Sequence, residues 1–142
     1  MAIYPFTPIL LLVLCATSIV CADVLNYEDF VTKHIMEDKE DMVASDCNDA
    51  IIQRGIKDKQ DSAKPKYFCK HINTFILTME TNVENICKEI RNGDLQSSDS
   101  FVKVKCTWDG KSEYPICQYT AERSNAQIKV KCVNHEPVHL YY

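Results

Sequence analysis

Six widely spaced cysteines constrain the fold of this chain more than any other feature. The sequence has 142 residues and eight cysteines, of which Cys15 and Cys21 fall in an apolar N-terminal segment. The other six are Cys47, Cys69, Cys87, Cys106, Cys117 and Cys132. No two of them form the Cys-x-x-Cys pair typical of zinc sites, and an even set in a small secreted chain favours disulfides. Three bridges are therefore expected, although six cysteines allow about 15 different pairings.

The N-terminal segment reads as a signal peptide. Residues 1–22 carry no charged side chain, contain the apolar run Ile9–Leu14 and end in Val20-Cys21-Ala22, a small-residue pattern suited to cleavage after Ala22. Such a segment is too short to remain as a membrane span and is typical of a cleaved leader. We expect a secreted, extracellular protein without stable membrane insertion, and a mature chain of residues 23–142 that forms one small domain.

The charge balance counts against broad binding of nucleic acid. The formal net charge is −4, whereas proteins that hold RNA usually gain affinity from Lys and Arg. It also counts against membrane disruption by a cationic surface. The charges are uneven, because residues 23–49 are mostly acidic while four lysines alternate along two predicted strands. From Lys103, Lys105, Lys129 and Lys131 we expect a local basic face on an acidic body.

Helical patterns are concentrated in the first two thirds of the chain. Asn26 suits a helix cap, and Phe30, Val31, His34 and Ile35 follow it at helical spacing. A second helix is expected over Cys47–Arg54, stopped by Gly55. A third is expected over 83–90, closed by Asn92-Gly93. Residues 57–66 are polar, end near Pro65 and lack periodicity, so we expect a loop there.

Strand patterns follow the helices. Apolar and polar residues alternate over 101–106 and 127–132, Asp109-Gly110 supplies a turn, and Val138 with Leu140 suits a final short strand. Helices first and strands later indicate an α+β domain. The fold class expected from the pattern is therefore α+β, with three short helices packed on an antiparallel sheet.

One seven-residue motif is far more specific than these patterns. It is Cys69-Lys70-His71-Ile72-Asn73-Thr74-Phe75, with His34 upstream and Pro137-Val138-His139-Leu140 near the C-terminus. Over residues 23–142 the chain resembles the pancreatic-type (ribonuclease A) superfamily, which also carries its first histidine about twelve residues into the mature chain. The resemblance implies a ribonuclease A-like domain with a curved antiparallel sheet. It also implies one disulfide pairing, Cys47–Cys106, Cys69–Cys117 and Cys87–Cys132. A fourth bridge of pancreatic members is missing, as in the three-disulfide, angiogenin-like and non-mammalian branch.

The chemistry implied by the resemblance is cleavage of single-stranded RNA after pyrimidines, through a 2′,3′-cyclic phosphate. Histidine suits both proton transfers because its ordinary pKa, about 6.5, lies near working pH. The resemblance makes His34 the base and His139 the acid. Lys70 would stabilise the negative charge of the phosphorane. No cofactor and no metal are implied.

Four further residues are placed on the substrate side by the same resemblance. Thr74 would bind the pyrimidine, Lys33 and the Leu140 N–H would contact phosphate, and Asn73 would lie beside the site and brace the backbone. RNA is thus the expected partner of a monomeric protein. Taken singly, His34, His139 and Lys70 would be ordinary surface or structural residues, and only their joint pattern carries the hypothesis.

Several positions depart from the family pattern. Tyr141 stands where many relatives have an Asp that orients the acid histidine, and Val133 stands where a Glu often contacts the second base. Asp29 and Thr32 replace basic residues that grip flanking phosphates. We expect weak, salt-sensitive activity on polymeric RNA. Residues 51–56 correspond to a nuclear-import patch of angiogenin-type members, of which only Arg54 remains.

Two alternatives remain open. The chain could be an angiogenin-like secreted signalling or host-defence ligand with weak or vestigial ribonuclease activity, whose partner is a cell-surface receptor. Alternatively, it could be an extracellular disulfide domain that does not bind RNA. His71 and His135 match no catalytic group of the family and are expected to be exposed.

Overall fold

The computed structural model describes residues 26–59 and 67–142, so the expected signal peptide over 1–22 lies outside the described residues. The helices are α2 (Tyr27–His34), α3 (Ala44–Gln53) and α4 (Glu80–Glu84), and α4 continues as the 3₁₀ turn η1 (Asn85–Cys87). The strands are β1 (Asp58–Lys59), β2 (Tyr67–Phe68), β3 (Ile72–Ile76), β4 (Asn92–Trp108), β5 (Tyr119–Val133) and β6 (Glu136–Tyr141). The expected α+β fold class is confirmed.

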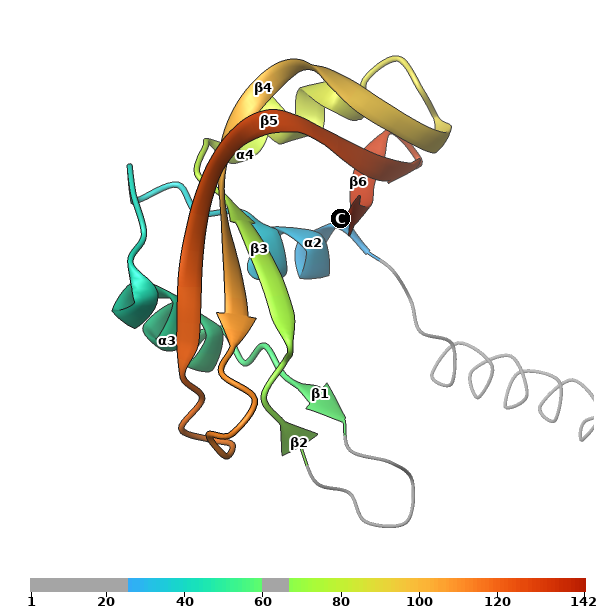
Figure 1. The fold of residues 1–142 in the computed structure, drawn as a ribbon. Helices are drawn as coiled ribbons and strands as arrows, with labels where there is room; N and C mark the ends of the chain where they lie inside the picture. Colours follow the sequence, from blue (N-terminus) through green and yellow to red (C-terminus); the bar gives the residue numbers. More distant parts are fainter. Residues whose placement is uncertain (1–25, 60–66) are drawn as a thin grey trace, which may run out of the picture.

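A curved antiparallel sheet forms the centre of the molecule. Its strand order is β3-β4-β5-β6, and the long strands β4 and β5 bend together into an arch (Figure 1). The register shifts between Gln96 and Ser100, where a bulge interrupts the β4–β5 pairing. The buried Ser97 hydroxyl accepts a hydrogen bond from the Ile128 N–H at 3.0 Å, so the bulge is tied to the facing strand.

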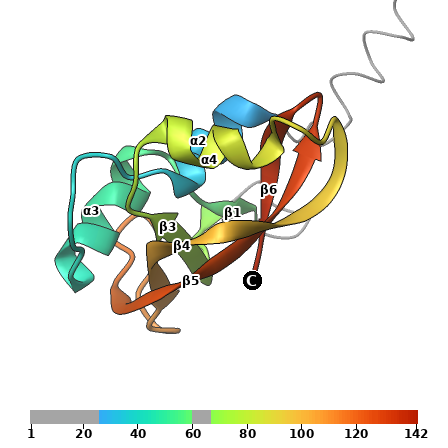
Figure 2. The same ribbon diagram turned by 90° about the horizontal axis from the view of Figure 1, so that it is seen from above.

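The helices cover two different parts of this sheet, and two hydrophobic cores result. α3 lies beside β5, while α2 contacts both β3 and β6, and α4 lies near β6 (Figures 1 and 2). The core under α3 contains Ile51, Phe75 and Val104. The core under α2 and α4 contains Phe30 and Val130. Because β4 and β5 contribute to both cores, one continuous strand pair joins the two halves of the domain.

Three disulfides hold these elements together. Cys47–Cys106 joins α3 to β4, Cys69–Cys117 joins the segment before β3 to the segment before β5, and Cys87–Cys132 joins η1 to β5. These are the pairs that the family resemblance implies. Each closes a long loop, the shortest spanning 45 residues, and closure of a loop of this size stabilises a small domain by about 4 kcal/mol on the chain-entropy model.

The first two helices agree with the sequence pattern. The Asn26 side chain caps α2 by accepting a hydrogen bond from the Asp29 N–H at 2.7 Å. α3 begins at Ala44, earlier than the expected Cys47, because the Asp46 carboxylate accepts from the Val43 N–H at 2.9 Å and starts the helix there. Gly55 follows with φ +66°, a left-handed conformation that ends a helix readily in glycine.

Two other expectations are wrong in part, and one strand was missed. The third helix does not run over 83–90, because the chain tightens into η1 at Cys87, whose sulfur is bonded to Cys132. The expected loop 57–66 contains β1, which pairs with β2; residues 60–66 lie outside the described part. β3 was not expected at all. Its last four residues are all buried, so the strand shows no alternation of polar and apolar residues.

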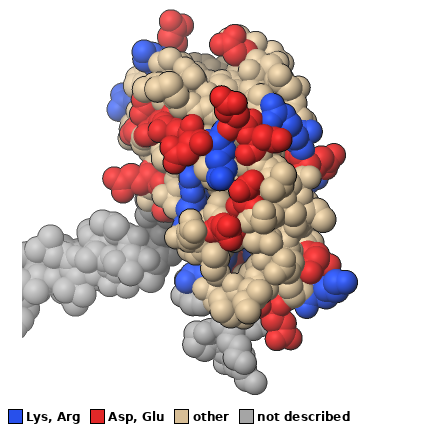
Figure 3. Space-filling model, turned by 90° about the vertical axis from the view of Figure 1, so that its left-hand side faces the viewer, with Lys and Arg blue, Asp and Glu red and all other residues tan. Residues whose placement is uncertain are grey.

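The lysines do not form one basic face. Lys103 and Lys105 lie opposite Ser124 and Glu122. Lys129 and Lys131 lie beyond the bulge, opposite Gln96 and Asp94. The two pairs therefore occupy separate ends of the sheet, each beside an acidic residue. On the face shown in Figure 3, acidic side chains likewise alternate with Lys and Arg.

Within residues 26–59 and 67–142, no helix has the length and hydrophobicity needed to cross a membrane. His71 and His135 are exposed, as expected.

Candidate active site

His34 is fixed at the C-terminal end of α2. Its ring is 7% exposed and lies 5.3 Å, centroid to centroid, from the ring of Phe30, one helical turn earlier. Nδ1 lies 2.8 Å from the Thr74 carbonyl oxygen. Because that oxygen can only accept, Nδ1 carries the proton in the neutral ring and donates. The lone pair of the neutral imidazole is thus on Nε2, which is the nitrogen free to accept a proton.

The surroundings of His34 disfavour its charged form. Burial lowers the pKa of His34 from 6.5 to about 4, although the hydrogen bond to Thr74 opposes this shift. The positive groups of Lys70, Lys33 and His139 lower the pKa further. These cationic groups from three separate segments therefore gather around one neutral imidazole, which is the electrostatic setting of an anion site.

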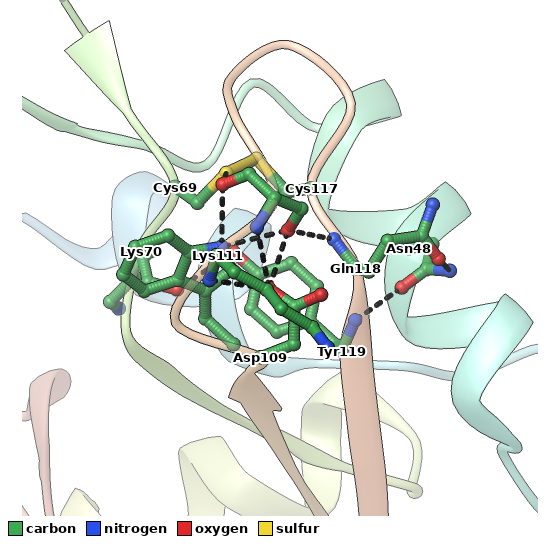
Figure 4. Close-up of a disulfide and its surroundings, with 10 residues drawn as sticks. Asn48, Cys69, Lys70, Asp109, Lys111, Cys117, Gln118 and Tyr119 are labelled. Atoms are coloured by element: carbon green, nitrogen blue, oxygen red, sulfur yellow. Dashed lines mark hydrogen bonds between the residues drawn. A yellow bond between two sulfur atoms is a disulfide. The ribbon is translucent and has the colours of Figure 1, made fainter.

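Lys70 is held from two sides. Its ammonium donates to Asn73 Oδ1 at 2.9 Å, and its carbonyl oxygen accepts from the Tyr119 hydroxyl at 2.7 Å. The preceding residue, Cys69, is bonded to Cys117, so the disulfide and Tyr119 fix the backbone at Lys70 (Figure 4). Partial burial lowers the pKa of the Lys70 ammonium, and the positive charge of Lys33 lowers it further.

Asn73 joins α2 to Lys70. The side chain is fully buried, its Nδ2 donates to the Lys33 carbonyl oxygen at 2.8 Å, and its Oδ1 accepts from Lys70. Both ends of the amide are thus occupied by protein groups. Asn73 therefore braces a helix end against a catalytic candidate, and its side chain is not exposed to solvent.

His139 is contributed by β6, on the opposite edge of the sheet from β3. It lies opposite Lys131 in the β5–β6 register and is half-buried. Its ring meets the ring of Tyr141 edge-to-face, at a centroid distance of 4.6 Å. The backbone of Leu140 lies between these two residues, while the Leu140 side chain is buried in the core.

A pocket of about 400 Å³ lies beside Thr74, lined by Ile72, Thr74, Lys103, Lys105, Glu122, Ser124 and Tyr142. Thr74 is 5% exposed and lies opposite Lys105 in the β3–β4 register. The Tyr142 side chain is largely exposed, but its hydroxyl is partly shielded from water, which raises its pKa. The nearby Thr74 backbone opposes this shift. Tyr142 therefore lies in the same pocket as the residue at which a pyrimidine was expected.

Arg54, a further position singled out from the sequence, makes contacts within the folded protein. Arg54 donates to the carbonyl oxygens of Ile35 at 2.6 Å and Thr32 at 3.0 Å and lies over the Phe75 ring. This residue is the one arginine of segment 51–56, which was compared with a nuclear-import patch, and its guanidinium is bonded to backbone carbonyl oxygens. Asp29 and Thr32 are exposed on α2. Within the described ranges, no group of three or more His, Cys, Asp or Glu is placed to hold a metal ion.

Sequence reasoning missed three contributors to the site. Tyr119, Asp94 and Tyr142 carry no motif; Tyr119 and Asp94 lie in the paired strands β5 and β4, and Tyr142 directly follows β6. Only the paired strands show that the Tyr141 hydroxyl donates to Asp94, 47 residues earlier, at 2.8 Å.

The chain is similar to known proteins over most of its length. The family model described as pancreatic ribonuclease matches residues 25–141. An angiogenin of Gallus gallus is 32% identical, with 95% of this chain and 91% of that protein covered. A ribonuclease of Chelydra serpentina is 30% identical, with 80% and 94% covered.

A solved structure of a similar protein has the same fold. The X-ray structure of zebrafish RNase5 is 25% identical, has a TM-score of 0.65, and is matched over 81% of this chain and 91% of that chain. Helices, sheet, disulfides and family model lead to one conclusion: the chain belongs to the pancreatic ribonuclease family.

Proposed function

We propose that this protein is a secreted endoribonuclease that cleaves single-stranded RNA after pyrimidines, with residues 1–22 as its signal peptide. His34 is the base, His139 the acid, and Lys70 the charge that stabilises the phosphorane. Three disulfides support an oxidising compartment outside the cytosol. RNA is the partner, and the protein acts as a monomer.

The first half-reaction begins at Nε2 of His34. This nitrogen accepts the proton of the ribose 2′-hydroxyl, whose oxygen bonds to the adjacent phosphorus. The bond from phosphorus to the 5′-oxygen breaks as His139 gives that oxygen a proton. The products are a 2′,3′-cyclic phosphate and a 5′-hydroxyl end. Hydrolysis of the cyclic phosphate by water then uses the two histidines in reversed roles.

Positive charge supports the pentacoordinate intermediate. The Lys70 ammonium is partly buried and oriented by Asn73, so it meets a developing anion with little reorganisation. Lys33 adds a second positive charge, and the Leu140 N–H is a further donor. Substrate phosphate would also raise the pKa of His34, because a nearby anion favours the imidazolium that forms when the base accepts its proton.

The observation that carries this proposal is the hydrogen bond between His34 and Thr74. It selects the imidazole tautomer, aims Nε2 away from the strand, and joins the proposed base to the residue that would bind the pyrimidine. The positive groups of Lys70, Lys33 and His139 also lower the pKa of His34, which supports an anion site beside the ring.

Activity should be modest. The overall charge of −4 is unfavourable for RNA, α2 offers Asp29 and Thr32 where flanking phosphates would lie, and Tyr142 reaches Thr74. These features, with the likeness to an angiogenin over 95% of the chain, favour a second candidate. That candidate is a secreted signalling or host-defence ligand with weak ribonuclease activity and a receptor partner.

The test is cleavage of a fluorogenic dinucleotide-type substrate that contains one ribopyrimidine. His34→Ala, His139→Ala and Lys70→Ala should each lose about 10²-fold or more in kcat/KM, the usual scale for a positioned acid, base or charge. His71→Ala and His135→Asn are matched controls, since both histidines are exposed, and they should keep wild-type activity. If wild type were inert with all three bridges formed, the enzyme proposal would be wrong.

The same variants distinguish the ligand proposal from the enzyme proposal. A cellular effect that survives His139→Ala would favour the ligand, and one that disappears with catalysis would favour the enzyme.

A further inference from the structure

We propose that Tyr141, held in place by Asp94, is the positioning residue that orients the imidazole of His139. The inference rests on the proposed function, because it concerns the group assigned as the acid. It adds that residues of three strands, β4, β5 and β6, hold the ring of the proposed acid in position.

Few contacts fix the His139 ring directly. Within residues 26–59 and 67–142, no hydrogen bond to either of its ring nitrogens is present, and its one aromatic neighbour is Tyr141. The two rings meet edge-to-face, with a centroid distance of 4.6 Å and an interplanar angle of 83°. This is the favoured geometry for an aromatic pair. The orientation of the imidazole therefore depends on where the Tyr141 ring lies.

The Tyr141 ring is itself held at two further points. Its hydroxyl donates to Asp94 Oδ1 at 2.8 Å, and Lys129 Nζ lies over its face, 5.3 Å from the centroid. The hydrogen bond raises the pKa of Tyr141, so the phenol stays protonated and keeps donating at neutral pH. Asp94 and Lys129 thus prevent the ring from turning away from His139.

The strand register explains why these groups meet. Tyr141 lies opposite Lys129, and His139 lies opposite Lys131, which in turn lies opposite Asp94. The hydrogen bond from Tyr141 to Asp94 therefore runs diagonally from β6 across β5 to β4. A side chain as long as tyrosine can span that diagonal, whereas a short side chain at 141 would leave Asp94 unpaired.

Positioning of this kind affects the rate more than substrate binding. An acid must point at the leaving oxygen, and a displacement of about 1 Å can cost about 10²-fold in rate. Loss of the Tyr141 ring should therefore lower kcat, while KM stays near the wild-type value because His139 is not the main holder of substrate.

The experiment compares four variants of the whole protein. Tyr141→Ala removes the ring, Tyr141→Phe keeps the ring and removes the hydroxyl, Asp94→Ala removes the acceptor, and Asp94→Asn keeps an acceptor oxygen. We expect kcat to fall about 10- to 100-fold in Tyr141→Ala, and several-fold in Tyr141→Phe and Asp94→Ala. Asp94→Asn should restore most of the rate. Tyr27→Phe is the control for loss of a tyrosine hydroxyl outside the site.

A second measurement does not depend on turnover. The imidazole proton resonances of His139 are followed by NMR in each variant. Tyr141→Ala should remove the ring-current shift of His139, while the resonances of His135 stay in place. Asp94→Ala should also move the His139 resonances, because the Tyr141 ring is no longer held. A side chain that merely stabilised β6 would leave the His139 resonances unchanged in Asp94→Ala.

The outcomes separate the inference from the proposed function. An active wild type whose kcat was unchanged by Tyr141→Ala, and whose His139 resonances were unchanged by Asp94→Ala, would overturn the inference and leave the ribonuclease proposal standing. An inert wild type would overturn the ribonuclease proposal, while the NMR series still reported whether Tyr141 orients His139. If Tyr141→Ala did not fold, Tyr141→Phe and Asp94→Ala would decide by the same readouts.

Discussion

The amide of Asn73 donates a hydrogen bond to the carbonyl oxygen of Lys33 at 2.8 Å. This partly buried bond connects the end of α2 to β3, two elements that are distant in sequence. It satisfies a carbonyl at the helix end, where no partner within the helix is available. The same amide holds the Lys70 ammonium, so one side chain sets the relative position of the proposed base and the proposed electrostatic catalyst.

Asn73→Ala should destabilise the protein and impair catalysis together. Removing the amide leaves the Lys33 carbonyl without its partner, which costs about 1–3 kcal/mol, and frees the Lys70 ammonium to move. Urea unfolding should show the loss as a lower midpoint, and kcat should fall in the folded variant. Asn82→Ala is the matched control, because its amide bonds Thr78 on the surface, and it should change stability by less than about 0.5 kcal/mol.

Stability should depend on the charge state of His34. The folded protein binds the His34 proton only below about pH 4, whereas the unfolded chain binds it below about 6.5. Between these values the unfolded state holds more protons, so the free energy of unfolding falls as the pH is lowered from 6.5 to 4. The full effect is about 3 kcal/mol, since each pKa unit corresponds to about 1.4 kcal/mol.

Chemical denaturation between pH 7.5 and pH 4 tests this dependence. His34→Asn removes the titrating group, so the difference between wild type and variant should change across that interval and be constant above pH 7.5. Parallel curves throughout would show that His34 does not titrate abnormally. Inorganic phosphate at the site should raise the His34 midpoint measured by NMR, because the anion stabilises the imidazolium.

Two disulfides of similar loop length should differ in their effect on activity. Cys69–Cys117 and Cys87–Cys132 close loops of 48 and 45 residues, so replacing either pair by Ser should cost about 4 kcal/mol of stability on the chain-entropy model. Only Cys69–Cys117 adjoins Lys70. At a temperature where both variants are folded, the Cys69→Ser/Cys117→Ser variant should lose the greater share of kcat. Equal losses would mean that the bridge does not position Lys70.

Removal of the Tyr142 hydroxyl should improve substrate binding. Tyr142→Phe removes a hydroxyl near the Thr74 backbone, which leaves the Thr74 N–H more accessible to a pyrimidine; one hydrogen bond of about 0.5–1.5 kcal/mol corresponds to about a 2- to 10-fold lower KM. Inhibition by inorganic phosphate serves as the control and should not change, because phosphate would bind at the cationic groups around His34. A KM that stays at the wild-type value would show that Tyr142 does not compete with substrate.

The parts of the fold that are local in sequence were predictable. The α2 cap at Asn26 and the shared face of Phe30 and His34 depend on neighbours within one or two turns. The disulfide pairing came from the family motif, since spacing alone leaves it open. β3 was missed because Asn73 and Thr74 are polar residues that are nevertheless buried. The strand therefore lacks the alternation of polar and apolar residues by which a strand is recognised.

The parts that depend on register were not predictable. Whether Tyr141 meets Asp94, or Tyr142 meets Thr74, is decided by the bulge after Gln96 and by how far the sheet curves. Neither leaves a signal in a single sequence. His34, Lys70 and His139 were proposed from the family motif, while the contacts around them, such as Tyr119 to Lys70 and Tyr141 to Asp94, come from strand pairing.

The positions of the proposed site residues depend on the curvature of the sheet, because β4 and β5 bend into an arch. β3 and β6 are opposite edges of a four-stranded sheet, yet both contact α2, because the bend turns the edges toward each other. A flatter sheet would leave every side chain in its local setting and still move His139 away from Lys70. Ser97, whose hydroxyl ties the bulge to β5, therefore bears on where His139 lies although it is distant from that residue along the chain.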